Sequence, residues 1–195
     1  MIWRHFDISR LTEEEYNYWF SLMDAKKQHK VLQYVNLATR KRTVVGEMLA
    51  REMIAEYCGI DQENILISVD ERGKPFTENA HINFNISHSD DMVVCCISDK
   101  PVGIDVERVK PINPNIMKKL CTDSDMRYIL NSENTDIPKL LSKDQQYRLY
   151  EIWTAKEAYF KCLGTGITNL KSISFSELIN KRKLYNIEDY IVTII

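Results

Sequence analysis

An alternation of apolar and polar residues constrains the fold more than any other feature of this chain, and it runs from Val102 to Glu107. Val102, Ile104 and Val106 form the apolar set, and Gly103, Asp105 and Glu107 form the other set. A period of two residues predicts a β-strand with one buried face. Asp105 and Glu107 then project from the same face, roughly 6.5–7 Å apart at about 3.3 Å per residue.

A second segment, from Trp153 to Lys161, has helical composition and supplies a third carboxylate, Glu157, with Lys156 and Lys161 beside it. Three converging carboxylates next to lysines suit a hard divalent cation such as Mg²⁺ and a phosphate-bearing substrate. A glycine on the face of the strand carboxylates predicts open space beside them. Two alternatives stay open, namely a solvated strand face and an exposed i,i+4 ion pair between Glu157 and Lys161.

The composition is that of an ordinary soluble globular protein, with 44% apolar and 28% charged residues. A chain of 195 residues buries a sizeable core, as one domain or two small ones. The net charge of -2 gives no argument for a nucleic-acid partner, and no apolar run approaches the roughly 18 residues of a membrane span. The N-terminus lacks the apolar stretch of a signal peptide, and the 5 cysteines lack C-x-x-C spacing. We therefore expect a cytoplasmic protein with free thiols that binds neither nucleic acid nor membranes.

Periodicity and turn signals predict a long helix and several strands in each half of the chain. The predicted helices are residues 11–27, 39–57, 116–120, 124–130 and 146–162. The predicted strands are residues 3–8, 65–69, 82–86, 92–98, 102–106, 173–175 and 190–194. Thr12 and Glu15 form a capping-box pattern, and Gly59 and Gly164 suit helix ends. The pattern predicts an α+β fold with halves at residues 1–100 and 101–195 in one compact unit.

Further polar residues are compatible with an anionic ligand, but also with ordinary turns and solvated faces. They are Ser87 and His88 at the end of a predicted strand, Lys74 and Pro75 in a turn, and Lys26 and Arg42 in two basic runs. Lys and Arg are the usual partners of phosphate, so the basic runs are candidates for the rim of an anion pocket. No Walker-type glycine loop and no G-x-S-x-G motif occurs, so nucleotide hydrolysis by that route and serine-hydrolase chemistry have no support.

Taken in order, these segments resemble the 4′-phosphopantetheinyl transferases of the surfactin-synthetase-activating type. The segments that carry the resemblance are Arg42–Gly46, Gly73–Phe76, Phe84–Ser89, Val102–Glu107 and Trp153–Lys161. The combination of G-I-D-V-E followed by W-x-x-K-E-x-x-x-K is highly specific, whereas G-K-P or S-H-S alone is not. The resemblance covers most of the chain.

The resemblance implies a monomeric enzyme that transfers the 4′-phosphopantetheine arm of coenzyme A to a serine of an acyl, peptidyl or aryl carrier protein. The reaction uses Mg²⁺ and releases adenosine 3′,5′-bisphosphate. The implied fold is a pseudo-two-fold pair of similar α+β halves with the coenzyme in the cleft between them. Whether the pathway is fatty-acid or nonribosomal peptide and polyketide biosynthesis stays open.

The resemblance also implies roles for individual residues. The implied metal ligands are Asp105, Glu107 and Glu157, of which Asp105 also lies against the coenzyme. Lys156 and Lys161 are implied to face the pyrophosphate, and Ser87 and His88 to hold the 3′-phosphate. The further implied coenzyme contacts are Lys26, Arg42, Lys74 and Pro75. Glu157 is the candidate general base, acting directly or through a metal-bound water, and Lys161 would stabilise charge on the leaving phosphate.

Three departures from the family pattern motivate a second hypothesis. Asp125 stands where the family commonly has a glutamate, the loop at residues 131–144 is longer than usual, and the chain ends at Ile195, earlier than typical members. The second hypothesis is a degenerate member that binds coenzyme A or a carrier protein without turnover. A third is an unrelated Mg²⁺-dependent phosphodiesterase built on the same acidic cluster. Retention of three carboxylates and both lysines favours the transferase.

Overall fold

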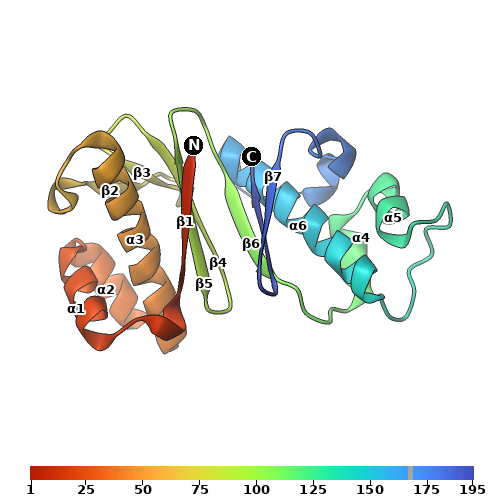
Figure 1. The fold of residues 1–195 in the computed structure, drawn as a ribbon, viewed down its shortest axis with the longest axis horizontal. Helices are drawn as coiled ribbons and strands as arrows, with labels where there is room; N and C mark the ends of the chain where they lie inside the picture. The colour runs from red at the N-terminus through yellow and green to blue at the C-terminus, as the bar shows by residue number, and fades with distance from the viewer. Residues whose placement is uncertain (167–168) are drawn as a thin grey trace. The chain divides into compact units, whose positions relative to one another are not determined.

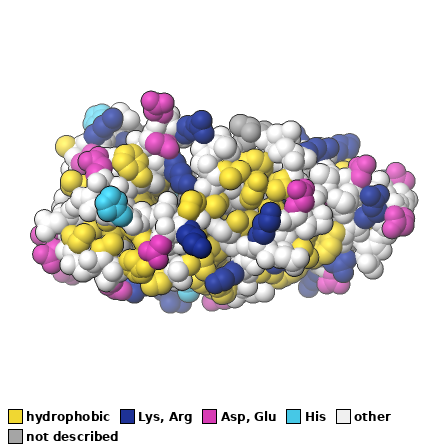
Figure 2. All heavy atoms as spheres, turned by 90° about the horizontal axis from the view of Figure 1, so that it is seen from above, with side chains coloured by type: hydrophobic (Ala, Val, Ile, Leu, Met, Phe, Trp, Pro, Cys, Tyr) yellow, Lys and Arg dark blue, Asp and Glu magenta, His cyan; other side chains and the backbone are white. Residues whose placement is uncertain are grey.

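The computed structural model describes residues 1–166 and 169–195, which divide into two units. Unit 1 comprises Met1–Val102 and unit 2 comprises Gly103–Ile195. Each unit combines a long helix with a three-stranded antiparallel sheet (Figure 1), so the predicted α+β class is confirmed. Over the face seen in Figure 2, Lys and Arg side chains are interspersed with Asp and Glu, in keeping with the small net charge. Within the described residues, none of the helices is both long enough and apolar enough to span a membrane.

Unit 1 is built around helix α3, which packs against a sheet of order β1-β5-β4. Its elements are β1 (Ile2–Asp7), α1 (Glu13–Leu22), α2 (Ala25–Gln33), α3 (Leu37–Cys58), β2 (Ile67–Val69), β3 (Pro75–Thr77), β4 (Asn83–Ser89) and β5 (Met92–Ser98), with 3₁₀ turns at Ile8–Arg10 and Gln62–Asn64. Strands β2 and β3 form a separate antiparallel pair. Helices α1 and α2, drawn in orange in Figure 1, both contact α3.

The register of β4 decides which of its side chains face α3. Phe84 pairs with Ile97 and Ile86 with Cys95, and these residues belong to the core packed against α3. Side chains alternate along a strand, so His88 lies on this α3-facing side and Ser87 lies on the opposite side. Both residues lie within β4, which runs to Ser89, so the prediction of a strand ending near residue 86 is wrong.

Side-chain caps determine where the helices of unit 1 begin and end. Thr12 and Glu15 form the predicted capping box of α1. The prediction of one helix over residues 11–27 is wrong, because Asp24 is extended and caps a new helix by accepting a hydrogen bond from Lys27 N. Gly59 ends α3 in the left-handed conformation with φ of 66°, as its sequence position predicts.

Unit 2 is built around helix α6, which packs against a sheet of order β6-β8-β7. Its elements are β6 (Ile104–Arg108), α4 (Met117–Leu120), α5 (Asp123–Leu130), α6 (Lys143–Leu163), β7 (Lys183–Ile187) and β8 (Tyr190–Ile194), with 3₁₀ turns at Pro114–Ile116, Leu170–Ser172 and Phe175–Glu177. The C-terminal strand β8 is the central strand of this sheet. The segment between α5 and α6 has no helix or strand.

The prediction of a strand at residues 173–175 is wrong. Phe175 begins a 3₁₀ turn, and its side chain and that of Ile173 are buried in the core of unit 2. Strands β3 and β7 were not predicted, since both are short and partly polar and form only by pairing with β2 and β8.

Candidate functional site

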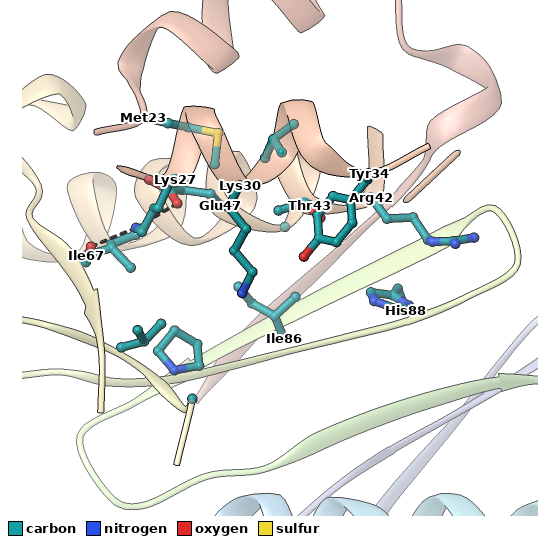
Figure 3. Close-up of a pocket in the computed structure, with 15 residues that line it drawn as sticks. Met23, Lys27, Lys30, Tyr34, Arg42, Thr43, Glu47, Ile67, Ile86 and His88 are labelled. Carbon is teal, nitrogen blue, oxygen red and sulfur yellow. Dashed lines mark hydrogen bonds and ion pairs between the residues drawn. The ribbon is translucent and has the colours of Figure 1, made fainter. Parts of the chain in front are cut away.

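The side chains predicted to act on the ligand lie in two sets, one in each unit. In unit 1, a cavity of about 340 Å³ is lined by residues of α2, α3, the β2-β3 pair and β4 (Figure 3). Its basic side chains are Lys27, Lys30, Arg42 and His88. Figure 3 shows Lys30 extending from α2 toward Ile86, and Arg42 lying on the same side of the cavity as His88.

Lys27 is held in place by a buried acidic side chain. Its Nζ donates to Glu47 Oε2 at 2.8 Å and to the carbonyl oxygen of Ile67 at 2.7 Å. Glu47 is 8% exposed, and its Oε1 accepts from Arg51 Nε at 3.1 Å and Nη2 at 2.9 Å. The Arg51–Glu47–Lys27 chain fixes α2 to α3 and to β2, and Glu47 compensates part of the positive charge on this wall of the cavity.

Arg42 is also anchored, but with one donor left over. Its Nη1 donates to the carbonyl oxygen of Asp90 at 2.8 Å and its Nη2 donates to Thr39 Oγ1 at 3.1 Å. Its Nε is buried and has no hydrogen-bond partner among the described residues. A buried guanidinium N–H without an acceptor is costly, and an anionic ligand would satisfy it.

The structure brings some of the predicted unit 1 residues together and separates others. Arg42, Pro75 and His88 line the cavity, and their roles toward the coenzyme stay predictions. Lys26 lines a neighbouring hollow of about 440 Å³ instead, and Lys74 lines a small one of about 180 Å³. Ser87 is buried on the opposite face of β4 from His88, so the two side chains do not lie on one side of the sheet.

Sequence reasoning noted the basic run at residues 26–30 but selected Lys26 from it. The structure lines the cavity with Lys27 and Lys30. Val31 and Tyr34 line it too, and these four residues share one face of a helix at i, i+3, i+4 and i+7 spacing. That spacing was a usable signal for the inward-facing lysines.

In unit 2, Lys161 lies between two carboxylates from different elements. Its Nζ lies 2.5 Å from Asp105 Oδ1 on β6 and 3.9 Å from Glu157 Oε2 one turn back on α6. The side chains of Asp105, Glu157 and Lys161 are 2%, 18% and 20% exposed. The one positive charge of the ammonium group therefore lies beside two carboxylates that water reaches poorly, and it balances only one of their two negative charges.

The surroundings of Glu157 shift the pKa of its carboxyl group. Burial and then the charge of Asp105 raise its pKa above the ordinary value, while a hydrogen bond from Trp153 Nε1 to Glu157 Oε1 at 2.6 Å and the charge of Lys161 act in the opposite direction. Glu107 lies two residues along β6 and is half-buried. Among the described residues no group of three or more His, Cys, Asp or Glu side chains is arranged to hold a metal ion. The three-carboxylate metal site stays a prediction.

Lys156 occupies a different environment from Lys161. It is fully buried, and its Nζ donates to Asp125 Oδ2 at 2.5 Å and to the carbonyl oxygen of Leu120 at 2.8 Å. Asp125 is 1% exposed; its Oδ1 accepts from Phe175 N at 2.7 Å, and it closes the capping box of α5 with Thr122. The pair ties α6 to α4, α5 and the turn at Phe175. In this structure the ammonium of Lys156 faces the interior of unit 2, in contrast to the expected place at a pyrophosphate.

Gly103 does not leave open space beside the carboxylates, so that expectation is wrong. A Cβ atom at this position would lie 2.0 Å from the carbonyl oxygen of Ala158 and 2.5 Å from the backbone nitrogen of Cys162. The start of β6 therefore touches the backbone of α6. The glycine permits the close approach that brings Asp105 within reach of Lys161.

Two family models match the chain in succession. One, described as 4′-phosphopantetheinyl transferase, N-terminal, matches residues 10–100, and the other, described as the 4′-phosphopantetheinyl transferase superfamily, matches residues 101–191. The chain is 31% identical over 182 residues to the 4′-phosphopantetheinyl transferase Sfp of Bacillus subtilis, covering 91% of this chain and 76% of that protein. The chain belongs to the 4′-phosphopantetheinyl transferase superfamily.

Other relatives agree with this membership. The 4′-phosphopantetheinyl transferase gsp of Aneurinibacillus migulanus is 35% identical over 153 residues, covering 78% of this chain and 60% of that protein. The L-aminoadipate-semialdehyde dehydrogenase-phosphopantetheinyl transferase of Xenopus laevis is 31% identical over 150 residues, covering 69% of this chain and 47% of that protein. The resemblance read from the motifs is thus confirmed, and the match to several relatives spans only part of their length.

Proposed function

We propose that this protein transfers the 4′-phosphopantetheine arm of coenzyme A to a serine of an acyl or peptidyl carrier protein, using Mg²⁺. The observation that carries the proposal is the group formed by Asp105, Glu157 and Lys161, in which a strand and a helix of unit 2 bring two poorly hydrated carboxylates to one cation. Membership of the superfamily, through relatives named as 4′-phosphopantetheinyl transferases, identifies the reaction for which such a group is suited.

The chemistry of the unit 2 carboxylates fits a hard divalent cation. Asp105 and Glu157 repel each other, since the negative charge of Asp105 contributes to the raised pKa of Glu157, and a cation bound to both carboxylates would relieve that repulsion. Carboxylate oxygens are the protein ligands that Mg²⁺ prefers, and Mg²⁺ keeps further positions for water and substrate phosphate. Asp105, Glu157 and Glu107 are the residues that would hold the ion. When bound, Mg²⁺ neutralises charge on the pyrophosphate of the coenzyme.

The unit 1 cavity suits the phosphorylated nucleotide end of the coenzyme. Arg42 offers its buried Nε–H, and Lys30 and His88 line the same cavity. Charge-assisted hydrogen bonds from such donors are about twice as strong as neutral ones. We assign the 3′-phosphate to His88 and Arg42. The role expected for Ser87 has less support, because its side chain lies on the opposite face of β4.

The residues of unit 2 then have separate tasks in the reaction. Glu157 accepts the proton of the carrier serine as that hydroxyl attacks the β-phosphorus, and its raised pKa makes it a better base than an exposed glutamate. Lys161 stabilises the negative charge that develops on the departing adenosine 3′,5′-bisphosphate. Lys156 acts on neither group directly; with Asp125 it fixes the orientation of α6 and therefore of Glu157.

The test is a mass measurement on a panel of acyl, peptidyl and aryl carrier proteins incubated with coenzyme A and Mg²⁺. Transfer adds the mass of one phosphopantetheine group to a carrier, and Glu157→Gln or a chelator removes the gain. If no carrier in the panel gains that mass while coenzyme A binds tightly, the protein is a binder without turnover. Hydrolysis of a generic phosphodiester without any carrier would instead indicate a phosphodiesterase.

A further inference from the structure

Lys161 already occupies the position at which a cation is needed between Asp105 and Glu157. Its Nζ makes a 2.5 Å contact with Asp105 Oδ1 and lies 3.9 Å from Glu157 Oε2. Asp105 is nearly inaccessible to water, so the charge–charge contact is made in an environment that screens it weakly. An ion that binds Asp105 Oδ1 and Glu157 Oε2 together has to take the place of this ammonium group.

We propose that Lys161 is an internal counter-ion that Mg²⁺ displaces, and that the displaced ammonium moves to a phosphate of the coenzyme. The inference rests on the proposed function for the identity of the ion and the ligand. Lys161 has the means to make this move, because it sits in the last turn of α6 on a flexible four-carbon stem. Each group keeps a partner of opposite charge in this exchange. Asp105 gives up the ammonium group and gains Mg²⁺, and the ammonium group gives up Asp105 and gains a phosphate.

The exchange couples the two ligands. Without the coenzyme, Mg²⁺ binding breaks the Lys161–Asp105 contact and leaves the ammonium with no phosphate to pair with. With the coenzyme present, a phosphate receives the ammonium and the carboxylates become available to the ion. Mg²⁺ and coenzyme A therefore raise each other's affinity by the same factor, as thermodynamic linkage requires. The wild-type protein binds Mg²⁺ weakly until the coenzyme arrives.

The experiment is a pair of Mg²⁺ titrations by calorimetry, one without and one with saturating coenzyme A, on the wild-type protein, Lys161→Met and Lys143→Met. Methionine keeps the length and apolar stem of lysine, so Lys161→Met preserves packing while removing the charge. Lys143 is the exposed first residue of the same helix, about 27 Å away at 1.5 Å per residue, and is the matched control.

The expected result is that Lys161→Met binds Mg²⁺ about tenfold more tightly than wild type without the coenzyme, because one charge-assisted hydrogen bond no longer has to be broken. In Lys161→Met, the factor by which coenzyme A increases the affinity for Mg²⁺ is about tenfold smaller than in wild type. Lys143→Met behaves as wild type in both titrations. Melting gives an independent readout, since Lys161→Met removes the positive charge beside Asp105 and Glu157 and should show a larger rise in Tm on addition of Mg²⁺ than wild type does.

Two results would overturn the inference. One is an unchanged or weaker Mg²⁺ affinity of Lys161→Met without the coenzyme. The other is tighter binding by the same factor with and without coenzyme A, which would mean that Lys161 only repels the ion at a distance and does not exchange with it. Failure of the proposed function is a different outcome, in which the wild-type protein binds no Mg²⁺ even with the coenzyme or transfers nothing to any carrier.

Discussion

The contact between Gly103 and helix α6 leads to the sharpest stability prediction, for the substitution Gly103→Ala. The added Cβ would lie 2.0 Å from the carbonyl oxygen of Ala158, where ordinary contact begins at 3.4 Å. The atoms in its way belong to a helix backbone, which cannot rotate aside as a side chain can. Strand β6 and helix α6 therefore have to separate locally by about 1.4 Å, the difference between the two distances.

The cost follows from the bonds and packing at this position. Overpacking a well-packed interior costs about 1–3 kcal/mol, and a clash with rigid backbone belongs at the upper end of that range. Gly103 also exchanges two backbone hydrogen bonds with Ile195, at 2.9 and 3.0 Å, which hold β6 beside the end of the chain. Weakening both adds about 1–2 kcal/mol, so we expect Gly103→Ala to lower the free energy of unfolding by about 3–5 kcal/mol.

Urea unfolding followed by circular dichroism measures this loss. At a slope of about 2 kcal/mol per molar urea, the midpoint should fall by about 2 M. The matched control is Gly46→Ala in helix α3, where the three atoms nearest the added Cβ all belong to side chains, and the closest of them is Ile86 Cγ2 at 3.1 Å. The better helix propensity of alanine, about 1 kcal/mol, offsets that mild crowding, so this variant should unfold within about 1 kcal/mol of wild type.

A backbone clash at this position is ruled out if Gly103→Ala and wild type share one midpoint, or if Gly46→Ala loses as much stability as Gly103→Ala. A functional consequence follows from the same displacement. Moving β6 away from α6 separates Asp105 from Lys161 and Glu157, so the variant should also bind Mg²⁺ and coenzyme A with weaker mutual enhancement than wild type.

Three further predictions concern the remaining contacts. Asp125→Ala leaves the ammonium of Lys156 buried without its carboxylate partner, which should lower the free energy of unfolding measured in urea by about 3–5 kcal/mol. The double variant with Lys156→Met should recover part of that loss, and an unchanged midpoint for the single variant would contradict the pairing. His88→Ala should weaken coenzyme A binding about tenfold in calorimetry and leave 3′-dephospho-coenzyme A unaffected, whereas Ser87→Ala should not distinguish the two ligands; equal losses for both ligands in His88→Ala would remove His88 from the 3′-phosphate. Glu157→Gln should reduce transfer at least about 100-fold with little change in the coenzyme A affinity measured without Mg²⁺, and a modest reduction would argue against a role as general base.

Local signals in the sequence were sufficient where the structure itself is local. The capping box of Thr12 and Glu15 and the helix end at Gly59 involve residues within one turn of each other, so their patterns predict their structures. The break before α2 was equally local in origin, because Asp24 caps the new helix, but residues 11–27 have helical composition on both sides of it. Strand β7 is different, since it exists through pairing with β8, and pairing partners are not encoded in a single short segment.

The candidate site shows the same division. Alternation along β6 correctly placed Asp105 on a strand, and the helical segment correctly carried Glu157 and Lys161. The interpretation of Gly103 failed because a glycine has the same sequence signal in an open site and at a close backbone contact. Which of the two applies depends on where α6 packs, and that is a tertiary fact.

The positions of Lys156 and Lys161 could have been separated from helical geometry alone. At about 100° per residue, positions five apart lie about 140° apart around the helix, whereas Glu157 and Lys161 differ by about 40°. Two lysines so placed cannot both face one phosphate, and the structure directs Lys161 to Asp105 and Lys156 to Asp125. The adjacency of lysine and glutamate in the motif then has a structural reason. The buried Lys156 fixes the rotation of α6 about its axis, and this rotation determines the direction in which the next side chain, Glu157, points.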